Sequence, residues 1–101
     1  MPEVKLPAPV KAVLVPDMDS VKATPGAFEY YSYRGRFPAG MIYNCPCGCG
    51  VPGALAFRPI EEEGRASWEW NGNREAPTLS PSINHVGHWH GWLREGYFVD
   101  A

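Results

Sequence analysis

The run Asn44-Cys45-Pro46-Cys47-Gly48-Cys49-Gly50 constrains the fold of this chain more than any other stretch. It contains all three cysteines, and the three histidines lie in a second short segment, residues 85–90. An odd number of clustered thiols does not fit a disulfide framework, and Cys-x-Cys spacing makes a low-strain disulfide hard to close. Thiolate and imidazole are instead the ligands that zinc prefers. The sequence therefore predicts that one Zn²⁺ ion joins the two segments.

The predicted metal ligands are Cys45, Cys47, Cys49, His88 and His90. The two histidines are two positions apart, so in an extended strand they would point to the same face. A Cys3His site is the first interpretation and a Cys2His2 site the second. A site closed by four protein ligands is structural, whereas catalysis needs an open position. The residues leave open which four side chains bind, whether the site is open, and whether the ion is zinc or iron.

Strand signals follow one another along the chain, and no stretch shows helical periodicity. The 11 glycines and 11 prolines interrupt the sequence too often for a long helix. Candidate strands or extended segments cover residues 10–15, 28–33, 41–43, 54–58, 65–70, 77–83, 92–94 and 97–99. We therefore predict an all-β fold, either a small zinc-stabilised β-sandwich or a partly open barrel.

A chain of 101 residues has room for one domain. Its first stretch contains Pro2, Pro7 and Pro9, which exclude a helix and favour an extended conformation. We predict an extended N-terminal arm over residues 1–26 and a zinc-binding β-domain over residues 27–101. Such an arm is suited to docking on a partner.

Charge and hydropathy narrow the classes of partner. The formal net charge of -2 provides no basic field and argues against a protein that binds nucleic acid through phosphate contacts. No apolar run reaches the length of a membrane span. The residues after Met1 contain no apolar segment of the kind found in secretory signals. We expect a protein of the cytoplasm that does not bind membranes.

Known catalytic motifs are missing from the sequence. It contains no GxSxG elbow, P-loop, HExxH or dinucleotide fingerprint. The deaminase signature is also absent, because no HxE motif precedes a PCxxC motif. Glu69 and Glu95 are the nearest candidates for a general base, and both fit solvated carboxylates better. These observations favour a non-enzymatic protein.

Four blocks in the last part of the chain carry a resemblance. They are Cys45–Gly50, Trp68–Asn73, Pro77–Ile83 and His90–Gly96. With them, about the last 60 positions resemble a group of small uncharacterised proteins common in phages, prophages and bacteria, some of which carry an unsupported "ammonia monooxygenase" label. The resemblance implies a zinc-binding β-domain of phage origin and no established activity.

Together these features predict a phage-encoded structural or interaction protein. A virion accessory role, either capsid-decorating or tail-associated, fits the arm and the aromatic strand at residues 28–33. Its partners would be phage structural proteins or further copies of itself, in the virion or in the cytoplasm of the host cell. Two alternatives stay open: a small zinc-dependent hydrolase, and an inhibitor or adaptor directed at a host protein.

Overall fold

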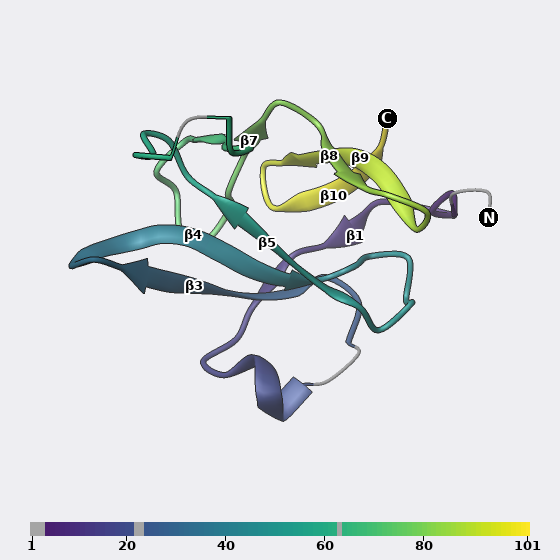
Figure 1. Ribbon diagram of the computed structural model, residues 1–101. Coiled ribbons are helices and arrows are strands. Elements are labelled where there is room, and N and C mark those ends of the chain that lie inside the picture. The colour runs from purple at the N-terminus through teal and green to yellow at the C-terminus, as the bar shows by residue number, and fades with distance from the viewer. Residues whose placement is uncertain (1–3, 22–23, 63) are drawn as a thin grey trace.

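The computed structural model describes residues 4–21, 24–62 and 64–101, which are almost entirely strands and turns (Figure 1). The elements in chain order are β1 (Val10–Lys11), β2 (Val13–Leu14), the 3-10 helix η1 (Met18–Val21), β3 (Ala27–Tyr33), β4 (Arg36–Asn44), β5 (Pro52–Ala56), β6 (Glu69–Trp70), β7 (Leu79–Ser80), β8 (Ile83–His85), β9 (Trp89–Arg94) and β10 (Tyr97–Asp100). The predicted all-β class is confirmed. In the described ranges no helix is long and apolar enough to cross a membrane.

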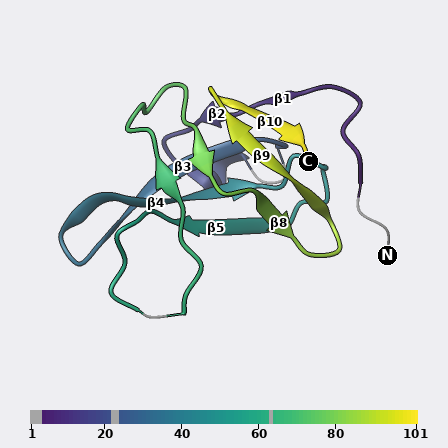
Figure 2. The ribbon, with the colours of Figure 1, turned by 90° about the horizontal axis from the view of Figure 1, so that it is seen from above.

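Two four-stranded sheets pack as layers, and neither closes into a barrel. One has the order β1-β10-β9-β8 and the other β2-β3-β4-β5, while β6 and β7 form a separate pair. Figures 1 and 2 show β8, β9 and β10 lying over β3, β4 and β5. All pairings in the first sheet are antiparallel, and β2 runs parallel to β3 in the second. The result is a thin layered fold with one core between the sheets.

Strand β9 shows how sequence alternation builds that core. Trp89 and Leu93 are fully buried, whereas His90 and Trp92 between them are only partly buried. Successive side chains of a strand point to opposite faces, so the first two enter the core and the second two lie on the outer face of the sheet. One face of β9 therefore packs in the core, and the other face carries His90 and Trp92.

The two sheets meet through aromatic rings. Tyr43 of β4 stacks on Phe98 of β10, with ring centroids 5.7 Å apart. Phe98 in turn meets the edge of Trp89 at 5.8 Å. Such pairs contribute about 0.5–1.5 kcal/mol each beyond the area that they bury. The end of β4, from which the cysteine run departs, is thus held against the strands that carry the histidines.

The segment predicted as an N-terminal arm contributes a strand to each sheet. Val10 pairs with Phe98 in the first sheet, and Val13 pairs with Ala27 in the second. Residues 1–3 and 22–23 of the predicted arm, and residue 63 of the predicted zinc-binding β-domain, lie outside the described residues. Where it is described, the segment is therefore joined to the rest of the chain by backbone pairing.

The carboxylate of Asp100 joins three parts of the first layer. It accepts a hydrogen bond of 2.9 Å from the indole nitrogen of Trp89 and bonds of 3.1 Å from the backbone nitrogen of Leu6. Trp89 is completely buried, so its N–H has no access to water. Asp100 therefore satisfies the one polar atom of the largest core side chain and holds the N-terminal segment beside it.

We expect Asp100→Ala to lower the free energy of unfolding by about 1–3 kcal/mol, because it leaves a buried indole N–H without an acceptor. Urea denaturation measures this loss. Asp100→Asn is the matched control, since it keeps an acceptor oxygen and should cost less. Equal losses in the two variants would show that the hydrogen bond to Trp89 is unimportant.

Candidate functional site

The three cysteines converge in the turn that follows β4. Their Sγ atoms all lie within 4.8 Å of one another, although Cys45 is buried, Cys47 partly buried and Cys49 exposed. The turn closes through a hydrogen bond from the backbone nitrogen of Gly48 to the carbonyl of Cys45. Gly48 has a φ of 86°, a conformation that glycine adopts without strain. The backbone nitrogen of Val51 donates to the Cys49 sulfur at 3.4 Å. Local backbone geometry therefore gathers the thiols.

The surroundings of these thiols affect their ionisation. Burial raises the pKa of the Cys45 thiol to about 12. Burial also acts to raise the pKa of Cys47, but hydrogen bonds from Cys45 and Cys49 outweigh it and lower that pKa. The Cys45 and Cys47 sulfurs are 3.2 Å apart. Three free thiols at this spacing form a donor set that can bind a metal ion, as the sequence predicts.

The histidines lie in three different places along one hairpin. His85 ends β8, His88 belongs to the turn, and His90 is the second residue of β9. Gly87 has a φ of 80°, which turns the chain just before His88. His88 therefore lies outside the strand that carries His90, so the two do not belong to one extended strand.

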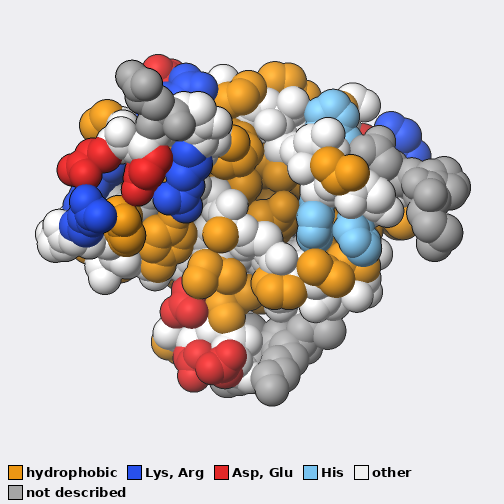
Figure 3. All heavy atoms as spheres, viewed as in Figure 1, with side chains coloured by type: hydrophobic (Ala, Val, Ile, Leu, Met, Phe, Trp, Pro, Cys, Tyr) orange, Lys and Arg blue, Asp and Glu red, His pale blue; other side chains and the backbone are white. Residues whose placement is uncertain are grey.

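Two of the imidazoles form a pair of their own. The rings of His85 and His88 are 4.7 Å apart, and His85 also meets the ring of Tyr43 at 6.2 Å. Figure 3 shows that histidine side chains lie in separate places on this face of the molecule. Burial and the neighbouring His88 lower the pKa of His85, whose buried Nδ1 has no hydrogen-bond partner among the described residues.

In the described part of the chain, no histidine joins the group of three sulfurs. The assignment of His88 and His90 as metal ligands stays a prediction, and His90 has a different partner. Its Nε2 lies 3.1 Å from the hydroxyl oxygen of Ser82. The two side chains come from neighbouring segments, since Ser82 directly precedes β8 and His90 lies in the paired strand β9.

A tryptophan side chain forms a hydrogen bond with the backbone of Ser82. The indole nitrogen of Trp68 donates a hydrogen bond of 3.3 Å to the Ser82 carbonyl oxygen. Both Ser82 and His90 are partly buried. A serine hydroxyl within hydrogen-bond reach of an imidazole nitrogen is the arrangement in which histidine activates serine as a nucleophile.

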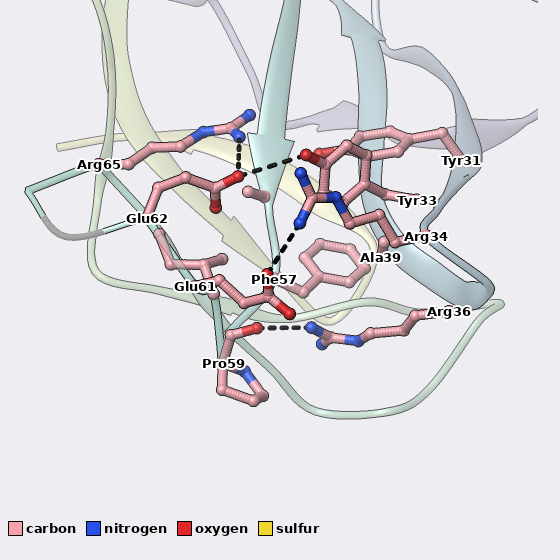
Figure 4. A pocket seen from close by; sticks show the side chains of 12 residues that line it. Tyr31, Tyr33, Arg34, Arg36, Ala39, Phe57, Pro59, Glu61, Glu62 and Arg65 are labelled. Atoms are coloured by element: carbon pink, nitrogen blue, oxygen red, sulfur yellow. Dashed lines mark hydrogen bonds and ion pairs between the residues drawn. The ribbon is translucent and has the colours of Figure 1, made fainter.

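A pocket of about 170 Å³ lies elsewhere, between the β3–β4 hairpin and the loop after β5 (Figure 4). Its rim is charged: Arg34 pairs with Glu61 at 3.0 Å, and Arg36 donates to the Pro59 carbonyl. Phe57 forms part of its apolar floor. Neither the cysteines nor the histidines nor Ser82 line it. Among the described residues, the three thiols, the His85–His88 pair and the Ser82–His90 pair therefore all lie outside this pocket.

The sequence of this chain matches one known family model. The family model of BubE, described as "bacterial ubiquitination-like system serine protease", matches residues 15–101. The chain belongs to the BubE family. No curated protein and no solved structure matches it. The family is described as one of serine proteases.

Membership of the BubE family overturns the predicted function. The prediction of a phage-encoded structural protein, either capsid-decorating or tail-associated, is wrong, because the matching family is one of serine proteases. The sequence contains no GxSxG pattern that would indicate a serine protease. Ser82 lies in the run Pro77–Ile83 without any GxSxG pattern, and its contact with His90 exists only in the folded hairpin.

We expect metal content per chain to fall in Cys47→Ser and in Cys49→Ser, since each removes one sulfur from a set of three. Elemental analysis of the purified variants measures this. His85→Ala serves as the control and should retain more metal than either. If all three variants kept the metal of the wild type, the sulfur cluster would not be its binding site.

Proposed function

We propose that this protein is a serine peptidase of a bacterial ubiquitination-like system, with Ser82 as nucleophile and His90 as general base. The observation that carries the proposal is the 3.1 Å contact between Ser82 Oγ and His90 Nε2. It supports the proposal because the chain belongs to a family described as serine proteases. A pair of this kind is recognised by its geometry and roles, not by its position in a sequence.

In the proposed reaction the Ser82 hydroxyl oxygen attacks the carbonyl carbon of the scissile bond. His90 Nε2 accepts the hydroxyl proton as the new C–O bond forms, and then gives it to the leaving amine. The product is an acyl-enzyme on Ser82. A water molecule, deprotonated by the same nitrogen, hydrolyses this ester and restores the serine. Each step needs His90 to alternate between neutral and protonated forms.

The family description points to a protein substrate. We propose that it is a ubiquitin-like protein, or a conjugate of one, because BubE proteins are described as part of a ubiquitination-like system. The placement of Ser82 directly before β8 suits this, since β8 is an edge strand of its sheet. An extended substrate segment can lie along such a strand. Cytoplasmic localisation follows from the proposal and agrees with three unpaired thiols.

For the cysteine cluster we propose a structural Zn²⁺ ion held by Cys45, Cys47 and Cys49, with a fourth protein ligand that closes the site. The donor set supports zinc, because thiolates in a tight turn are its usual structural ligands. The ion would stabilise the turn after β4 and take no part in the peptidase reaction. Elemental analysis distinguishes zinc from iron.

We expect Ser82→Ala and His90→Ala each to lower turnover by about 10³-fold or more, because members of a nucleophile–base pair fail together. The assay uses a ubiquitin-like protein joined through its C-terminus to a reporter protein. A fluorophosphonate probe should also label the wild type at Ser82, as mass spectrometry would show.

Ser80→Ala is the matched control, since Ser80 is an exposed serine two positions earlier and should be dispensable. Full activity in Ser82→Ala, or fluorophosphonate labelling at another serine, would refute the assignment of the nucleophile.

Removing the ion with a strong chelator should lower the melting temperature, because the binding free energy of a structural zinc contributes to folding. For a domain of this size each kcal/mol corresponds to about 4–8 °C. Calorimetry with and without chelator measures the shift. The Cys47→Ser variant, already short of one sulfur, should respond less. An unchanged wild-type melting temperature after complete metal removal would contradict a structural role.

A further inference from the structure

The residue directly opposite His90 in the sheet is Asn84. The register of β8 and β9 pairs these two residues. Residues in opposite positions of an antiparallel pair share a face, and their Cβ atoms are about 4.5–5.5 Å apart. Asn84 is exposed and His90 partly buried, so both lie on the outer face, with Ser82 two residues before Asn84. Asn84 is therefore the cross-strand neighbour of the histidine that contacts Ser82.

Asn84 is free to engage this imidazole. Among the described residues its side chain makes no hydrogen bond, so its amide can rotate without losing one. The charged groups nearby are occupied: Arg94 of β9 lies over the ring of Trp92 at 4.5 Å, and Asp100 of β10 binds Trp89. Asp100 is also paired with Gly91, a buried position, and so belongs to the inner face.

A general base that uses Nε2 needs its proton on the other ring nitrogen. In neutral histidine one nitrogen donates and the other accepts, and a hydrogen-bond acceptor beside Nδ1 selects the form with a free Nε2 lone pair. In serine proteases a buried carboxylate does this. The amide oxygen of Asn84 can accept the same bond without adding a charge.

We infer that Asn84 is a positioning residue: its Oδ1 accepts the Nδ1–H bond of His90 and thereby holds the imidazole in the orientation and tautomer that activate Ser82. The inference rests on the proposed peptidase function. Contacts of this kind are often loose without substrate and tighten in the complex. Since the pair spans two adjacent strands of one hairpin, only a side-chain rotation is needed to close it.

The test compares Asn84→Leu with Asn84→Asp. Asn84→Leu removes the acceptor and should lower kcat by up to about 10²-fold with little change in KM, because the base is misplaced but the substrate surface remains. Asn84→Asp keeps an acceptor oxygen and should retain most of the activity. Arg94→Ala is the control on the same face and should leave kcat unchanged.

A second measurement does not depend on activity. Nitrogen-15 NMR of the imidazole reports which nitrogen of His90 carries the proton, and the Nδ1–H form should dominate in the wild type and in Asn84→Asp but not in Asn84→Leu. An unchanged tautomer ratio together with an unchanged kcat in Asn84→Leu would overturn the inference. If Ser82→Ala is inactive in the same assay, that outcome leaves the peptidase assignment intact. If Ser82→Ala is fully active, the proposed function fails, while the tautomer measurement still decides the role of Asn84.

Discussion

The burial of Trp89 is the interaction on which the rest of the arrangement depends. Its ring fills the space between the sheets, and its N–H is satisfied by Asp100. Gly91 makes this possible, because a Cβ there would collide with the Trp89 ring and with the Val99 carbonyl. Because successive side chains of a strand point to opposite faces, the side chain of the next residue, His90, points outward. One large anchored side chain thus determines where the imidazole points.

The same core connects the two candidate sites without merging them. Tyr43 stacks on Phe98 between the layers, and two residues later Cys45 begins the thiol cluster. The Ser82–His90 pair lies on the outer face of the sheet β1-β10-β9-β8, away from this core. A metal ion at the cysteines would therefore affect the pair only through the stability of the shared core, which fits a structural ion better than a catalytic one.

Much of the fold is predictable because its signals are local. Turn residues and alternating side chains indicate the last hairpin, and Cys-x-Cys spacing by itself indicates a thiol cluster. The position of His88 is not predictable in this way, because residues 85–90 resemble one extended strand, whereas Gly87 turns the chain and β9 begins only at Trp89. The contact between Ser82 and His90 is also not predictable from the sequence. A serine has no spacing signature of its own, and the register of β8 and β9 is what brings His90 to it.

The residues of each site nonetheless lie close together along the chain, which suits a small domain. Ser82 and His90 are separated by 8 residues, and the cysteines span fewer still. Closing a short loop costs little conformational entropy, so forming the hairpin already brings the proposed nucleophile and base together. The remaining problem is precision, because a misplacement of about 1 Å can cost two orders of magnitude in rate. The core addresses that problem by fixing the buried face of β9. On the outer face we infer that the side chain opposite His90, Asn84 of β8, restrains the imidazole.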